Sequence, residues 1–138
     1  MANITKEIRA ALESNLINVS GSPITPEIAY QNVSYTPTTG TSYIEVSYLP
    51  TSRRPSVRGL NPQQRYEGVF AVNCYAPEGK GPAEAETIAE NVIAAFEATT
   101  SLTLNNVTVS IDYAEVEQGF LDAPWFMVPV IIGWYAYN

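Results

Sequence analysis

The feature that most constrains the fold is the spacing of apolar residues, which switches between two periods along the chain. Two segments repeat apolar residues every three or four positions, as one face of a helix does. One follows Asn3, which can cap a helix, and the other begins at Pro82, a favoured first helical residue. Four further segments alternate apolar with polar residues or are rich in β-forming side chains, which predicts strands: Tyr43–Leu49, Tyr66–Ala76, Val107–Tyr113 and Trp125–Tyr137.

The order helix, strand, strand, helix, strand, strand predicts an α+β fold, α-β-β-α-β-β. We expect a four-stranded, mostly antiparallel sheet with two helices packed on one face. Pro129 lies within the last strand and indicates a bulge or a sheet edge there, because proline cannot donate to a ladder. The chain has 138 residues, of which 46% are hydrophobic, enough for one domain that spans residues 1–138.

An arginine-rich segment separates the first two predicted strands, which we interpret as an antiparallel hairpin. Its loop, Pro50–Gln64, is far longer than the two to five residues that a hairpin needs, and long ordered loops are often functional. The stretch TSRRPSVRGLNPQQR contains no acid, although the whole chain has fourteen acidic and only seven basic residues. Four of the seven lie here: Arg53, Arg54, Arg58 and Arg65. Because the segment is too polar for a core, this charge must face water or a partner.

Charge and composition exclude several classes of protein. A net charge of −7 argues against a nucleic-acid binder, which would show a basic face. The one cysteine, Cys74, allows neither an intrachain disulfide nor a cysteine metal cluster. The N-terminal sequence lacks the apolar run of a signal peptide, and the most apolar stretch, Trp125–Tyr137, is well short of the roughly 20 residues that cross a membrane. We therefore expect a protein made in the cytosol, without a membrane partner.

Residues that could carry catalysis are few. The chain has no histidine, which removes the commonest general base and metal ligand. Cys74 falls on the apolar face of its predicted strand and is expected to be a buried, inert core residue. Asp112, Glu115 and Glu117 are spaced so that they cannot all share one strand face, and a solvated face is the better interpretation. The sequence GKGP before the second predicted helix lacks the pattern of a phosphate loop. We predict no catalytic residue, no metal site and no cofactor.

Aromatic residues exceed what a core of this size needs. The chain has nine tyrosines and two tryptophans, several on predicted sheet faces or in loops. Tyrosine, tryptophan and arginine are the residue types enriched at interface hot spots, although tyrosine also simply suits strands. Together with the arginines, these aromatics favour self-assembly or partner binding, and the candidate interface residues are Arg53, Arg54, Arg58, Arg65, Tyr135 and Tyr137.

Four blocks of the sequence carry a resemblance to a known family. They are IRAALESNL, IAYQNVSYTPTTGTSYIEVSYLP, QRYEGVFAVNCYAPEGKGPAEAETIAENVIAAF and the closing VPVIIGW. In this order and spacing, which covers nearly the whole chain, they resemble the tail terminator-like proteins of long-tailed bacteriophages. The family motifs that can be transferred by residue are Arg65, Tyr66 and Gly68 at a strand start, and Gly79 and Gly81 in a turn. We interpret these residues as maintaining the fold.

The resemblance implies a structural virion protein at the junction of head and tail. Such a protein forms a hexameric ring on the head-proximal end of the tail tube, stops tube polymerisation and joins the tail to the head. The implied partners are further copies of the chain, the tail tube protein and a head–tail connector or stopper protein. Genomic DNA would pass through the lumen without specific binding, so we expect that lumen to be acidic or neutral.

Two other classes of function remain open from the residues alone. One is a small cytosolic binding module that uses its sheet face for a peptide or small ligand, and the other is an enzyme with carboxylate chemistry. If the chain forms a ring, its arginine loop recurs once per subunit and needs acidic partners nearby. We therefore predict that at least one of Arg53, Arg54 and Arg58 contacts a carboxylate or a carbonyl of another subunit.

Overall fold

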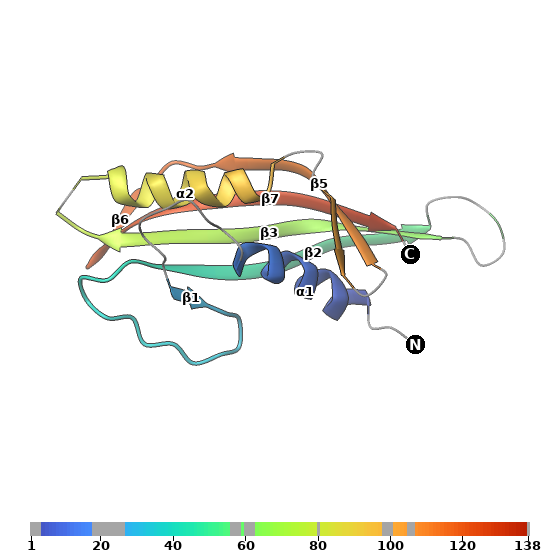
Figure 1. Ribbon diagram of the computed structural model, residues 1–138, viewed down its shortest axis with the longest axis horizontal. Coiled ribbons are helices and arrows are strands. Elements are labelled where there is room, and N and C mark those ends of the chain that lie inside the picture. Colours follow the sequence, from blue (N-terminus) through green and yellow to red (C-terminus); the bar gives the residue numbers. More distant parts are fainter. Residues whose placement is uncertain are drawn as a thin grey trace.

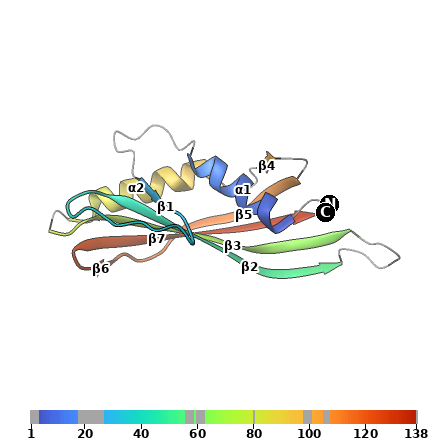
Figure 2. The ribbon, with the colours of Figure 1, turned by 90° about the horizontal axis from the view of Figure 1, so that it is seen from below.

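The computed structural model describes residues 4–17, 27–55, 59, 63–79, 81–97, 101–104 and 107–137. A strongly twisted β-sheet curls beneath two helices, and both helices lie on the same face of it (Figure 1, Figure 2). We call the face that the helices leave uncovered the open face.

Seven strands form this sheet within the described residues. They are β1 (Glu27–Ala29), β2 (Tyr43–Pro55), β3 (Gln64–Pro77), β4 (Ser101–Leu104), β5 (Val107–Val116), β6 (Phe120–Asp122) and β7 (Trp125–Tyr137). The strand order is β1-β2-β3-β7-β5-β4, and β6 pairs with the beginning of β7. β1 runs parallel to β2, whereas every other pair is antiparallel.

The prediction of a four-stranded, mostly antiparallel sheet is therefore wrong. The four predicted strands correspond to the long strands β2, β3, β5 and β7, and the sequence analysis missed β1, β4 and β6. Each missed strand has only three or four residues, too few for an alternating pattern to stand out. Because β1 joins β2 in parallel, the sheet is mixed, with short strands at its margins.

The helices bury their apolar stripes against the sheet. α1 (Ile4–Ile17) and α2 (Ala83–Ala95) both contribute to one core cluster with β2, β3, β5 and β7. Its largest fully buried side chains include Phe70, Phe96, Ile8, Leu12 and Ile132. Neither described helix has the length and apolar character that crossing a bilayer requires.

The predicted arginine loop Pro50–Gln64 is also wrong, because most of it belongs to strands. After a register shift between Pro50 and Ser52, the ladder continues to the pair Pro55 and Gln64. Beyond Glu45, β2 has no strand on its other side among the described residues, so the prolines interrupt no ladder there. The polarity that suggested a loop reflects strand ends exposed on both faces. We call these strand ends, Ser52–Pro55 and Gln64–Tyr66, the arm, which projects beyond both helices (Figure 1, Figure 2).

Pro129 lies in a central strand rather than at an edge. On one side, β7 pairs with β3 along its whole length, including Pro129 opposite Asn73. On its other side, β7 pairs with β6 as far as Met127 and with β5 from Val130 onward, so Pro129 falls in the gap between these two neighbours. The proline therefore marks the position at which β7 changes its partner.

A bulge in β5 changes the face on which Tyr113 lies. Val109 and Ile111 are buried beneath the helices, and a register shift follows between Ile111 and Tyr113. Alternation from Val109 and Ile111 would place Tyr113 on the same face, but its ring instead covers Gly133 on the open face, where a Cβ on Gly133 would overlap it. The missing side chain at Gly133 thus creates the space for the ring.

Candidate assembly site

Four of the six predicted interface residues lie together on the open face. The strand register sets Arg54, Arg65 and Tyr137 in one row across three strands, and places Tyr135 opposite Glu67 in the neighbouring row. Because residues two apart in a strand share a face, Glu67 and Tyr135 face the same way as Arg65 and Tyr137. We call this group, Arg54, Arg65, Glu67, Tyr135 and Tyr137, the arginine cluster.

Glu67 is shared by two guanidinium groups of the arginine cluster. Arg54 Nη2 lies 2.9 Å from Glu67 Oε1, and Arg65 Nε lies 3.2 Å from Glu67 Oε2. The hydrogen bond from Arg65 is the main cause that lowers the pKa of the Glu67 carboxyl below its ordinary value. Glu67 is therefore held as a carboxylate, and it offsets the charge of one of its two arginine partners.

Two tyrosine rings hold Arg65 in place. Its guanidinium carbon lies 4.6 Å from the Tyr135 ring centroid and 5.4 Å from that of Tyr137. Arg65 Nη1 also donates to the Tyr137 hydroxyl oxygen at 2.6 Å. These contacts combine cation–π attraction with a charge-assisted hydrogen bond, so the guanidinium is preorganised on the surface.

Arg53 lies on the opposite face of the arm, the face that carries the helices further along the sheet. It pairs with Tyr66, and its guanidinium carbon lies 5.3 Å from the Tyr66 ring centroid. Arg58 lies outside the described residues. The predicted set is thus divided: Arg54, Arg65, Tyr135 and Tyr137 come together, and Arg53 stands apart.

The sequence analysis missed Glu67 as a member of this site. Glu67 falls two residues after the end of the arginine-rich stretch on which the interface prediction rested. Residues two apart in a strand lie on the same face, so the sequence RYE already places the Glu67 side chain beside that of Arg65. The spacing could have shown that part of the positive charge is neutralised within the chain.

Most of the surplus aromatics have structural roles. Tyr43 and Tyr75 are buried on the open face at the end opposite the arm, stacked at 4.5 Å with an interplanar angle of 2°. Tyr35 and Trp125 pack against the same small cluster. Trp134 is buried on the helix side, stacked on Tyr48. Of the predicted interface aromatics, Tyr135 and Tyr137 stay at the surface, and Tyr113 and Phe120 are also exposed.

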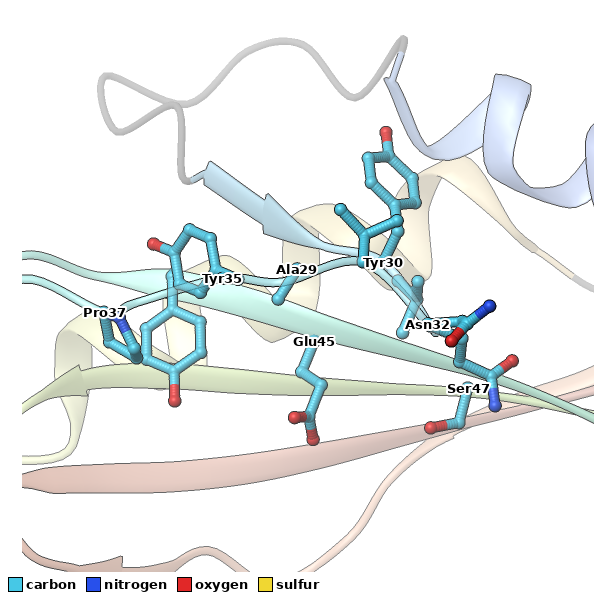
Figure 3. A pocket seen from close by; sticks show the side chains of 11 residues that line it. Ala29, Tyr30, Asn32, Tyr35, Pro37, Glu45 and Ser47 are labelled. Carbon is cyan, nitrogen blue, oxygen red and sulfur yellow. The ribbon is translucent and has the colours of Figure 1, made fainter.

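A surface hollow of about 390 Å³ borders the outer side of β2 (Figure 3). The segment after β1 forms one wall of this hollow. Gln31 fixes its position, because Gln31 Oε1 accepts hydrogen bonds from Tyr48 N at 2.8 Å and from Arg9 Nη1 at 2.7 Å. Tyr30 and Glu45 point to opposite sides of this segment (Figure 3). Their polar ends therefore do not converge on one point, as the groups of a specific ligand site would.

Chemical groups for catalysis do not gather in the part of the chain described. No group of three or more Asp, Glu or Cys side chains in the described ranges could hold a metal ion. Cys74 is fully buried, as predicted, and burial raises the pKa of its thiol to about 12. At neutral pH this thiol stays protonated and is a poor nucleophile.

Comparisons with known proteins give a family for this sequence. A family model described as "Phage tail terminator protein" matches residues 7–134. No curated protein matches the chain. One solved structure with 24% sequence identity superposes with a TM-score of 0.78, covering 99% of this chain and 97% of its own. A chain from a structure described as "Virion of native gene transfer agent (GTA) particle" gives a TM-score of 0.61 at 14% identity, with both chains fully covered. At these identities the two structures establish a shared fold.

Proposed function

Because the chain belongs to the phage tail terminator protein family, and so is a structural protein of a phage tail, we propose that it caps the head-proximal end of the tail tube. In this role it forms a closed hexameric ring that stops tube polymerisation and offers a surface to the head connector. The observation that carries the proposal is the family match over residues 7–134. The proposed role requires no catalysis.

The surface of the molecule supports an assembly role. A ring needs two different surface patches that fit each other under rotation. The arm, with Arg53 on one face and the arginine cluster on the other, lies at one end of the molecule, and α2 lies toward the opposite end (Figure 1). Two chemically different ends on one chain are what a head-to-tail contact between copies needs.

Electron cryo-microscopy of tails and of whole particles tests the proposal. We expect density for this chain as a sixfold ring between the tail tube and the head connector. Tails assembled without the chain should contain tubes of irregular, excessive length that fail to join heads. Finding the chain elsewhere in the particle, or tubes of normal length in its absence, would exclude the terminator role.

A further inference from the structure

One arginine of the arm has hydrogen-bond capacity that the described residues of its own chain leave unused. Of the four arginines that the structure describes, Arg9, Arg54 and Arg65 each donate to another side chain. Arg53 is exposed, with its guanidinium carbon 5.3 Å from the Tyr66 ring centroid, and it donates no hydrogen bond to any described residue. This cation–π contact holds the guanidinium near the ring, while its N–H groups stay available to a partner.

The exposed face of α2 carries two acids that could accept such hydrogen bonds. Glu86 and Glu90 are exposed, and neither forms an ion pair with a described Lys or Arg. They are four residues apart on one helix, so they lie side by side and repel each other. The last turn of α2 carries no basic residue that would offset its C-terminal dipole. A cation bound between Glu86 and Glu90 would relieve this repulsion.

The two features cannot meet within one molecule. The arm projects from one end of the sheet, and α2 covers the other end (Figure 1, Figure 2). Arg53 and α2 nevertheless lie on the same side of the sheet, because Arg53 pairs with Tyr66, which packs against the helix-covered core. A second copy can meet this contact only if it turns the exposed face of its α2 toward the helix side of the arm, which would bring Glu86 and Glu90 to Arg53.

We infer that Arg53 of one subunit binds Glu86 and Glu90 of the neighbouring subunit and so forms the contact that closes the ring. This inference rests on the proposed function, and it specifies the partner surface of the arm. The guanidinium fork binds carboxylates bidentately, which fixes orientation as well as charge. Arg54 is a weaker candidate because Glu67 and Ser52 already accept its hydrogen bonds.

Charge reversal tests the contact in cells that assemble tails. Arg53→Glu alone, or Glu86→Arg with Glu90→Arg, should reduce the amount of the chain on purified tails about tenfold or more, since like charges then face each other. The three changes combined in one chain reverse both sides and should restore the bound amount. Arg53→Ala provides a milder variant that removes the charge without repulsion and should give an intermediate loss.

A matched control reverses an acid elsewhere. Glu115 is exposed on β5, and Arg53→Glu combined with Glu115→Arg should remain as defective as Arg53→Glu alone. Circular dichroism spectra of each variant should match the wild type, and the melts should stay close to it apart from a small loss in variants with Glu86→Arg, which puts a positive charge in the first turn of α2. If the wild-type chain is found on tails but the reversals cause no loss, or the triple variant shows no recovery, this contact is excluded while the terminator role stands. Wild-type chain absent from the tails would overturn both.

Discussion

Cys74 shows what burial does to a single reactive group. Its side chain has no exposed surface and lies in the core between β2 and β7, where the charged thiolate would be poorly solvated. We expect a bulky maleimide to label the native protein negligibly and the denatured protein completely, as measured by intact mass. Cys74→Ala should cost about 1–2 kcal/mol of unfolding free energy and leave assembly unchanged. Rapid labelling under native conditions would contradict the buried position.

Glu67 gives the arginine cluster a dependence on pH. Its folded pKa is lowered, first by the hydrogen bond from Arg65, from an ordinary value of 4.5. A lowered folded pKa contributes stability that is present above pH 4.5 and is lost as pH falls through the folded value. Glu67→Gln should therefore melt below the wild type at neutral pH, and the two melting temperatures should converge in acid. Glu115→Gln, which has no charged partner among the described residues, should show no such convergence.

At the scale of elements, the bulge in β5 and Gly133 of β7 act as a pair. An alanine at position 133 would collide with the Tyr113 ring, and we expect Gly133→Ala to cost about 1–3 kcal/mol in urea unfolding. With Tyr113→Ala in the same chain, the added methyl group has room and that cost should shrink. A double-mutant cycle measures the coupling. Additive effects of the two changes would show that the ring does not depend on the space above Gly133.

How far the sequence predicts the elements depends on their length and their surroundings. The two helices and four long strands have enough residues for the 3.6-residue and two-residue periods to be read, and the buried position of Cys74 followed from the same pattern. β1, β4 and β6 carry too few residues for any period, and they form through contact with strands already present. The arm was mistaken for a loop because both of its faces are polar, which hides the alternation.

The candidate site was predictable in composition but not in partners. Arginine and tyrosine identified the surface, since both are enriched at interfaces. Which arginine is occupied and which is available depends on register: one residue separates Arg53 from Arg54, and they lie on opposite faces of the arm. Register in this hairpin includes a shift between Pro50 and Ser52, which no sequence period indicated.

For the whole molecule, charge predicts how the proposed ring would treat DNA. The chain has fourteen acidic and seven basic residues, and several of the described bases are engaged by acids of the same chain, such as Arg9 with Glu13 at 3.6 Å. We expect no tight binding of double-stranded DNA at physiological salt in a fluorescence anisotropy titration, as the lumen of the proposed ring would require for the genome to slide through. Tight binding that weakens steeply as salt rises would contradict an acidic or neutral lumen.

The outer side of β2 also determines how subunits can be stored before use. The Tyr48 N–H that could recruit another strand is already bonded to Gln31, and Pro50 and Pro55 remove two further donors. Exposed strand edges with free donors are templates for aggregation, and natural proteins block them with such devices. In the proposed role, a concentrated pool of free subunits would therefore remain colloidally stable, without fibrils, until a finished tube presents the surface on which the proposed ring forms.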